Sequence, residues 1–242
     1  MTGIAAHPHS PAIRLALLVA AFALTAQAAP PEFLPTAAIL DAASLDPARD
    51  IPSGGWFVVR GRNLSGALSV TIAGQASVIV RSRPGVESGL AYDELLAIAP
   101  ALPPGPALVV VTTPAGATPP RTVQCALFSP SLFGLEPSGG RYADASASEG
   151  AESIGPLNLF GSQPLDRPIR PAVPSELITL RANGCGRPTT TVAWLGQTAA
   201  EVVFSGVEVA AQPACVVRIR IPALAPGEYE VRVAMNLSLI HI

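Results

Sequence analysis

The sequence contains no lysine, so all 15 of its lysine-plus-arginine residues are arginines. A Schiff-base lysine and a phosphate-binding-loop lysine are therefore excluded. Histidine is almost as scarce. His7 and His9 lie near the N-terminus and His241 is the penultimate residue, so the body of the chain lacks the commonest general base and metal ligand. These absences disfavour a small secreted hydrolase.

Charge is also sparse: charged residues make up 13% of the chain and the net charge is −2, which gives no electrostatic basis for nucleic-acid binding. The 26 prolines and 21 glycines argue against long helices, because both residues interrupt them. A hydrophobic content of 49% argues against disorder. Short strands separated by Pro/Gly turns fit best, so an all-β fold is expected.

The N-terminus has the three-part pattern of a secretory signal peptide. Arg14 precedes an apolar run, Leu15–Ala26, and the small-x-small triplet Ala26-Gln27-Ala28 follows. The run is too short for a transmembrane helix, which needs about 20 apolar residues. We expect a signal peptide over residues 1–29, cleaved after Ala28 or Ala29, or else retained as an anchor. The protein would be secreted, periplasmic or at the cell surface, with no membrane span after cleavage.

An internal repeat organises the rest of the chain. Three turn segments recur at an offset of 122 (174 − 52). They are Ile51-Pro52-Ser53 with Val173-Pro174-Ser175, Ala73-Gly74-Gln75 with Leu195-Gly196-Gln197, and Pro103-Pro104-Gly105 with Ala225-Pro226-Gly227. Three anchors in one register indicate that the same unit occurs twice.

Each copy reads as short strands with turns about every ten residues, which is typical of a sandwich or barrel. The hypothesis is two tandem Ig-like (IPT/TIG-like) β-sandwich domains, at 36–134 and 161–242, joined by a Ser/Gly/Ala-rich segment at 135–160. The counterpart of the strand at Thr122–Leu127 would fall at 244–249, so the second sandwich is expected to be C-terminally incomplete. An incomplete sandwich exposes a strand edge, and the second copy should be the less stable half.

Two stretches carry a family resemblance. The first, Ile39 to Leu64, contains Asp41-Ala42-Ala43-Ser44 and Arg60-Gly61-Arg62-Asn63-Leu64; the second is Val70-Thr71-Ile72-Ala73-Gly74-Gln75-Ala76. Together they resemble a module of secreted acidobacterial proteins, the Solibacter-type uncharacterised C-terminal domain, and more broadly the IPT/TIG class of Ig-like domains. The resemblance covers most of Ile39 to Ala234.

The resemblance implies an Ig-like fold in extracellular, often multidomain proteins, where such modules serve as spacers, adhesion elements or binding platforms. It supplies no catalytic residue. The chain departs from the family pattern at Asp41, where Asn is usual, and at Asn183-Gly184-Cys185-Gly186, where a Thr-Gly-Leu-Gly stretch is usual.

The three cysteines, Cys125, Cys185 and Cys215, are too widely spaced for a zinc knuckle. A disulfide is expected after export. Cys185 and Cys215 fall at strand ends of the second copy and are the candidate pair, with Asn63 and Asp93 as their counterparts in the first copy. Cys125 would remain as an odd thiol.

The other candidates for chemistry are weaker. Asp144, Glu149 and Glu152 lack the spacing of a calcium loop, so no metal site and no cofactor is expected. Asp93-Glu94 and Glu228/Glu230 are conceivable as glycosidase carboxylate pairs, but Glu228 and Glu230 share the wet face of a strand. Tyr92 and Tyr142 are the candidate aromatics for stacking on a ligand.

The leading hypothesis is therefore an exported, non-catalytic Ig-like repeat protein used for extracellular binding, adhesion or spacing. The alternative is an accessory carbohydrate-binding region of a larger secreted enzyme whose catalytic domain lies outside this sequence. The expected partner is an extracellular protein or a glycan, and the expected state is a monomer.

Overall fold

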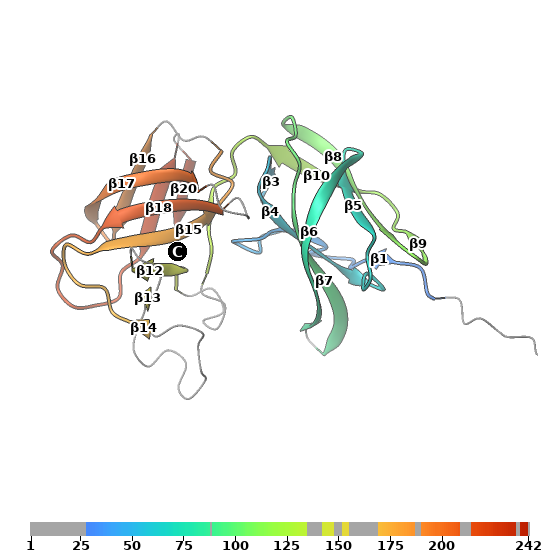
Figure 1. Cartoon of the computed structure of the whole chain (residues 1–242), viewed down its shortest axis with the longest axis horizontal. Coiled ribbons are helices and arrows are strands. Elements are labelled where there is room, and N and C mark those ends of the chain that lie inside the picture. The colour runs from blue at the N-terminus through green and yellow to red at the C-terminus, as the bar shows by residue number, and fades with distance from the viewer. Residues whose placement is uncertain are drawn as a thin grey trace, which may run out of the picture.

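The computed structural model contains two β-sandwich units, which lie side by side along the longest axis in Figure 1. It describes residues 28–87, 89–134, 142–147, 152–154, 169–186, 190–208, 214–235 and 238–241. Within these ranges there are strands, turns and loops but no helix, and hence no helix able to cross a membrane. The predicted all-β fold of two tandem Ig-like sandwiches is confirmed. Residues 1–27, which hold most of the predicted signal peptide, lie outside the described residues.

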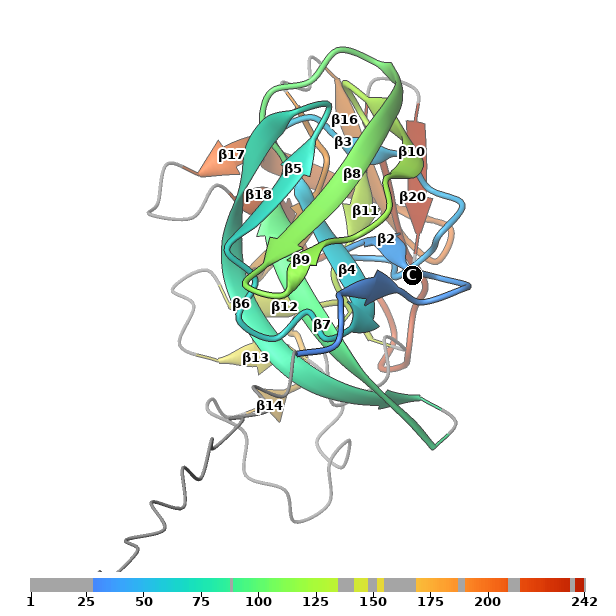
Figure 2. The same cartoon turned by 90° about the vertical axis from the view of Figure 1, so that its right-hand side faces the viewer.

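The first unit is a sandwich whose two layers share one long strand. Its strands are β1 (Glu32–Phe33), β2 (Ile39–Asp41), β3 (Ile51–Pro52), β4 (Trp56–Arg62), β5 (Ser69–Ile72), β6 (Gln75–Glu87), β7 (Leu90–Ile98), β8 (Gly105–Thr113), β9 (Gly116–Ala117) and β10 (Arg121–Ala126). One layer has the order β1-β4-β7-β6, with β2 also on β4, and the other has the order β6-β5-β8-β10-β3, with β9 also on β8. Figure 2 shows β5, β8 and β10 beside one another in the second layer.

β6 passes from one layer to the other at a bulge. Its first residues pair with β5, and its later residues pair with β7. The register with β7 shifts between Ile79 and Arg81, which bends the strand. Beyond the bulge, β6 and β7 continue as a long ribbon that projects from the sandwich (Figures 1 and 2).

Alternation along the strands builds the core of the first unit. Phe57 and Val59 of β4 face inward together with Val109 and Val111 of β8, and all four are fully buried. Leu64 joins this core from the turn after β4. The inward positions of facing layers interdigitate in this way in a sandwich.

The second unit repeats this plan. Its strands are β11 (Ser131–Leu132), β12 (Ala145–Ala147), β13 (Ser153–Ile154), β14 (Ile169–Arg170), β15 (Leu177–Asn183), β16 (Thr191–Leu195), β17 (Thr198–Glu208), β18 (Ala214–Arg220), β19 (Val231–Met235) and β20 (Ser238–His241). One layer runs β14-β13-β12-β15-β18-β17, with β11 also on β15, and the other runs β17-β16-β19-β20. β17 bends at a shift between Val202 and Phe204, as β6 does in the first unit.

The strand register refines the repeat offset. Val59 opposite Leu95 in the first unit matches Leu180 opposite Val217 in the second. Ile72 opposite Val109 matches Leu195 opposite Val231. Thr112 opposite Ala117 matches Ala234 opposite Leu239. The offset is therefore 121 for β4 and β15 (180 − 59), 123 for β5 and β16 (195 − 72), and 122 for β8 and β19 (231 − 109). The repeated unit has slipped by one residue on each side of the mean.

The slip is visible at the hairpin that carries the Gly-Gln anchor. In the first unit Ile72 pairs with Gln75, so the turn is Ala73-Gly74, both with positive φ. In the second unit Leu195 pairs with Thr198, so the turn is Gly196-Gln197. Two-residue hairpin turns require positive φ, and the glycine supplies it at a different turn position in each copy.

Strand pairing divides the chain differently from the predicted boundaries. β11 lies inside the predicted first domain, and β12 and β13 lie inside the predicted connecting segment, yet β11 and β12 pair with β15 and β13 pairs with β12. These short strands pair with the edge of a sheet whose other strands lie later in the sequence. Local composition therefore could not predict them. β20 pairs with β19 as β9 pairs with β8, and it is therefore the counterpart of β9.

Candidate functional site

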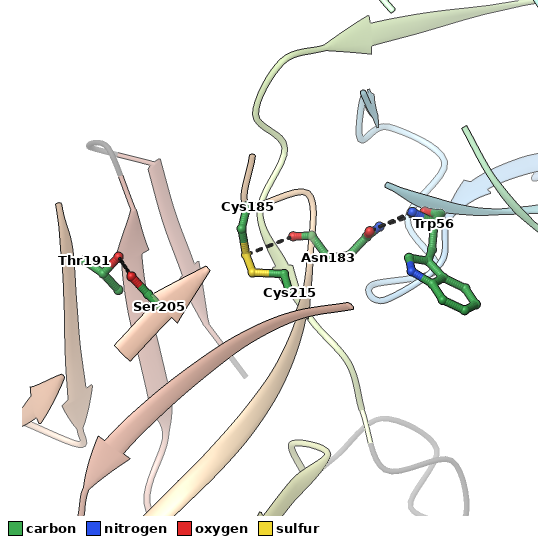
Figure 3. The surroundings of a disulfide bond; sticks show 6 residues. All are labelled: Trp56, Asn183, Cys185, Thr191, Ser205 and Cys215. Carbon is green, nitrogen blue, oxygen red and sulfur yellow. Dashed lines mark hydrogen bonds between the residues drawn. A yellow bond between two sulfur atoms is a disulfide. The ribbon is translucent and has the colours of Figure 1, made fainter. Parts of the chain in front are cut away.

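A disulfide joins Cys185 and Cys215 at one corner of the second unit, with Cα atoms 6.0 Å apart (Figure 3). Cys185 follows the end of β15, and Cys215 lies in β18 opposite Ala182. Both residues are buried in the core of the unit. The bond therefore fixes the turn after β15 to the neighbouring strand.

The first unit fixes the equivalent corner by different chemistry. Asp93 of β7 lies opposite Gly61 of β4, as Cys215 of β18 lies opposite Ala182 of β15. Its carboxylate Oδ2 accepts hydrogen bonds from the backbone N–H groups of Leu64 at 2.8 Å and Ser65 at 3.2 Å. By register, Leu64 and not Asn63 is the counterpart of Cys185.

Cys125 is buried in the first core, in β10 opposite Ile51. Burial raises the pKa of its thiol, and the charge of Asp50 raises it further. A thiol with a raised pKa carries little of the reactive thiolate at neutral pH. Cys125 is therefore a packing residue of the first sandwich.

A buried polar network joins the two units at Asp41 and Asn183, which are 0% and 1% exposed. Asn183 Nδ2 donates to Asp41 Oδ2 at 2.7 Å and to the Trp56 carbonyl at 2.7 Å, while its Oδ1 accepts from the Trp56 N–H at 2.8 Å. Figure 3 shows the Asn183 amide directed at the Trp56 main chain. Ser131 Oγ donates to Asp41 Oδ1 at 2.7 Å. We call Asp41, Trp56, Ser131 and Asn183 the junction network.

Asp41 also organises its own turn, since its Oδ1 accepts from the Ser44 N–H at 2.8 Å and the Ala43 N–H at 3.0 Å. Close packing at the junction requires glycine on both sides. A Cβ on Gly55 would lie 2.9 Å from Asn183 Oδ1, and a Cβ on Gly184, which has φ +65°, would lie 2.2 Å from the Ser129 carbonyl oxygen. Only glycine allows these backbones to approach so closely.

Sequence reasoning did not assign these residues a role. The one signal it had was that Asp41 and the stretch beginning at Asn183 depart from the resembling family's pattern. The structure brings these two departures into direct contact. No local pattern could have shown that contact, because the two residues lie 142 positions apart.

The carboxylates considered for catalysis are bound into structural contacts. Asp93 and Glu94 are neighbours in a strand and so point to opposite faces. Asp93 caps the turn described above, and Glu94 is buried between Arg60, at 3.0 Å, and Arg83, at 2.7 Å. The two groups do not face one cleft.

The acidic residues of the connecting segment are also separated. Asp144 pairs with Arg181 at 2.9 Å, and Glu152 pairs with Arg170. Glu149 lies outside the described residues. Within the described ranges no three His, Cys, Asp or Glu side chains form a group that could hold a metal ion.

Arg170 also contacts Glu176, whose carboxylate accepts from the Val173 N–H at 3.0 Å. The hydrogen bond from Arg170 lowers the pKa of Glu176, and the two carboxylates raise the pKa of Arg170. These contacts hold the chain between Arg170 and Glu176 in one turn.

The two candidate tyrosines have different surroundings. Tyr92 lies opposite Gly85 on the β6–β7 ribbon, and the Arg60 guanidinium lies 5.3 Å from the centre of its ring. A Cβ on Gly85 would lie 2.4 Å from the Tyr92 ring, so the ring covers the glycine closely. Tyr92 is thus held against its own sheet, whereas Tyr142 lines a groove and donates to Glu228 Oε1 at 2.8 Å.

That groove, which we call the second-unit groove, has a volume of about 1010 Å³ and a mostly apolar surface. Its floor includes the core residues Ile178, Leu180 and Leu195. One wall is Ala172–Pro174, and the opposite wall is Pro226–Val231, which includes Tyr229. Apolar clefts of this size with a few polar groups at the rim are typical of ligand sites.

No family model matches the chain, and no curated protein matches it. Among solved structures it is similar to SGBP-B from a xyloglucan utilization locus of Bacteroides uniformis, at 11% identity and a TM-score of 0.29, over 88% of this chain and 48% of that chain. It is similar to SGBP-B of the Bacteroides ovatus mixed-linkage glucan utilization locus, at 13% identity and a TM-score of 0.33, over 80% and 39%. A pair of tandem Ig domains of titin gives 10% identity and a TM-score of 0.21, over 80% and 87%.

The chain spans less than half the length of the two SGBP-B proteins. Likenesses this weak carry no argument about what the chain binds. Its function has to be argued from its own junction and groove.

Proposed function

We propose that this chain is an exported, non-catalytic Ig-like repeat module that holds two sandwiches in a fixed arrangement for extracellular binding, adhesion or spacing. The observation that carries the proposal is the junction network. The resemblance to secreted IPT/TIG-like modules agrees with it.

The network supports a fixed arrangement because hydrogen bonds are directional. Asn183 makes paired bonds to the N–H and C=O of Trp56, so a small rotation between the units would break both. A buried amide or carboxylate that loses its partner costs about 1–3 kcal/mol. Units within a chain move relative to one another by default, and this network opposes that motion.

A second set of contacts supports the same arrangement from the connecting chain. Arg49 Nη1 donates to the Pro130 carbonyl, and the Ser129 N–H donates to the Gly184 carbonyl at 3.2 Å. The segment between the units is therefore bonded to both of them. This is the construction expected of a rigid spacer or binding platform.

Small-angle X-ray scattering of the full chain tests the proposal. The wild type should fit a single arrangement. Asn183→Ala should broaden the distribution of interatomic distances, because it removes the hydrogen bonds that Asn183 makes to Asp41 and to the Trp56 main chain. Gln197→Ala, at an exposed turn, is the matched control and should leave the curve unchanged. A wild type that already scatters as a mixture of arrangements, with an unaltered curve for Asn183→Ala, would contradict the proposal.

A further inference from the structure

The outward face of the β16–β19 layer carries an aromatic side chain that the core of the second unit does not use. In β16, Ala193 and Leu195 lie in the core, so Trp194 between them points to the opposite face. Trp194 is half-buried. Its direct cross-strand neighbours are Ala199 of β17 and Arg232 of β19. The indole therefore stands on a sheet face between one methyl group and one long side chain.

Arg232 covers one side of this ring. Its guanidinium carbon lies 5.7 Å from the centre of the Trp194 ring, which is a cation–π contact. Its Nη2 donates to the Gly196 carbonyl at 2.5 Å and to Gln197 Oε1 at 3.4 Å, and Glu230 Oε2 lies 3.7 Å from its Nε. These contacts hold the guanidinium and the ring in place, so a ligand would bind without first having to order them.

The side of the Trp194 ring toward β17 has only a small neighbour, because Ala199 is exposed and offers a methyl group alone. Two donors are available beside the ring. The indole N–H of Trp194 and the Nη1 of Arg232 donate to none of the residues that the structure describes. A flat ligand on this side of the ring would therefore find an apolar surface beneath it and N–H donors at its edge.

The first unit has different side chains at the same positions. Thr71 of β5 lies opposite Ala76 of β6 and Val110 of β8, which is the pairing that Trp194 makes in the second unit. Thr71 is thus the counterpart of Trp194, and Val110 is the counterpart of Arg232. Because the first sandwich forms without an aromatic ring or a guanidinium there, the fold does not require them.

We propose that Trp194 and Arg232 form a glycan-binding site in which the indole is the stacking surface for one pyranose ring. A pyranose whose ring substituents are all equatorial presents C–H groups on both of its faces, and these pack on an aromatic face. Its hydroxyl groups lie around the ring edge, where they accept hydrogen bonds from N–H donors. The site deepens the binding role in the proposed function and rests on it, but none of its residues belongs to the junction network.

The charges at the site favour a neutral glycan over an acidic one. The Arg232 guanidinium is paired with Glu230, whose side chain is 48% exposed, so the pair has no net charge. A sugar carboxylate would be repelled by the carboxylate of Glu230. Gln197 and Glu230 instead offer oxygen acceptors to sugar hydroxyls, which donate as well as accept. The ligand class is therefore a neutral glycan of β-linked glucose or xylose, in which every ring substituent is equatorial.

Titration of cellohexaose and of β-1,4-xylohexaose into the ¹⁵N-labelled full chain tests the site. The two tryptophans give two indole N–H resonances, and Trp56→Phe assigns them. At least one hexasaccharide should shift the Trp194 indole resonance together with the amides of Gly196 and Ala199. The Trp56 indole resonance should stay in place.

Substitutions separate stacking from hydrogen bonding. Trp194→Ala should weaken binding about tenfold, because the stacking surface is lost, and Trp194→Phe should weaken it less. Arg232→Met keeps the length of the side chain but removes its donors, and should weaken binding about two- to tenfold. Thr71→Ala, at the counterpart position of the first unit, is the matched control and should bind as the wild type does.

The charge argument is tested with the hexamer of cellouronic acid, which differs from cellohexaose only in its C6 carboxylates. It should bind more weakly than cellohexaose at low salt. Equal or tighter binding would overturn the assignment to a neutral glycan.

Two further results would overturn the proposal. The first is that neither neutral hexasaccharide shifts the Trp194 indole resonance of a protein whose spectrum shows it to be folded. The second is that folded Trp194→Ala and Trp194→Phe bind as tightly as the wild type. Failure of the proposed function would be seen separately, in the scattering curve of the wild type, which the Trp194 substitutions should leave unchanged.

Discussion

At the scale of single residues, the structure depends on polar side chains that the sequence pattern did not select. Asn183 satisfies the main chain of Trp56 and the carboxylate of Asp41 at once. Burying the Asn183 amide is unfavourable unless its polar atoms find partners, and here the hydrogen bonds of its side chain go to Asp41 and Trp56 of the other unit. One asparagine therefore defines how the sandwiches meet.

Cys125 gives the prediction that belongs to this scale. Because its thiol is buried and its pKa is raised, it should react with a thiol reagent only when the first sandwich opens. In native protein at pH 7 with the disulfide intact, labelling by 5,5′-dithiobis(2-nitrobenzoic acid) should be negligible, and in 6 M guanidinium one thiol per chain should react. Rapid labelling of the folded protein would contradict this placement.

The inward-facing residues of the strands could be predicted from the sequence, but the contacts of the junction network could not. Strand alternation predicts that Val109 and Val111 share a face, and both are fully buried. The Asp41–Asn183 contact depends on how two folded units dock, which no periodicity within either unit encodes. Both residues depart from the pattern of the resembling family, but that departure does not show that they lie in contact.

At the scale of elements, the two units fix the same corner of the sandwich with different chemical groups. The turn after β4 in the first unit, and after its counterpart β15 in the second, is fixed to the neighbouring strand. The first unit does this with the Asp93 carboxylate and the second with a disulfide. Both are local interactions, but they differ in strength. One is a carboxylate that accepts two backbone N–H hydrogen bonds, and the other is a covalent bridge. Each can be removed without touching the other unit.

Removing each device should therefore destabilise one unit only. Cys185→Ala/Cys215→Ala should lower the free energy of unfolding of the second unit by about 2–4 kcal/mol, the range for a disulfide that closes a loop of this size. Asp93→Ala should lower that of the first unit by about 1–3 kcal/mol, because two backbone donors lose their acceptor. Urea denaturation followed by tryptophan fluorescence measures both.

The control for this comparison is Glu201→Gln, at an exposed position of β17, which should change neither unit. If Asp93→Ala destabilised the second unit as much as the first, the two corners would be coupled through the junction. The equivalence of the two corners as independent local devices would then be wrong.

Most long strands followed from alternation and turn residues, but their register did not. Three sequence anchors indicated one constant offset, whereas the strand pairs give offsets of 121, 122 and 123 (180 − 59, 231 − 109 and 195 − 72). The offset changes in the connections between strands and at a bulge, so each strand keeps its inward face. The sequence repeat shows the mean offset, and only backbone pairing shows the slips.

At the scale of the whole molecule, the two sandwiches differ in how they close. In the first, β10 and β3 pair over the core and bury Cys125 and Ile51. In the second, the described residues leave the same side as a groove with Val173 exposed. Apolar surface left in contact with water does not contribute to stability, so the second unit should be the weaker one.

Each unit carries one tryptophan, Trp56 in the first and Trp194 in the second, which makes the comparison measurable in the full chain. Trp56→Phe leaves Trp194 as the fluorescent reporter, and Trp194→Phe leaves Trp56. The junction network should survive Trp56→Phe, because Asn183 binds only the main chain of residue 56. In urea, the Trp194 signal should change at a lower midpoint than the Trp56 signal. Reduction of the disulfide should widen the gap, since it weakens the second unit alone.

Coincident midpoints of the Trp194 and Trp56 signals would contradict the stability difference. They would mean that the junction couples the two units into one folding unit, which unfolds in a single cooperative transition.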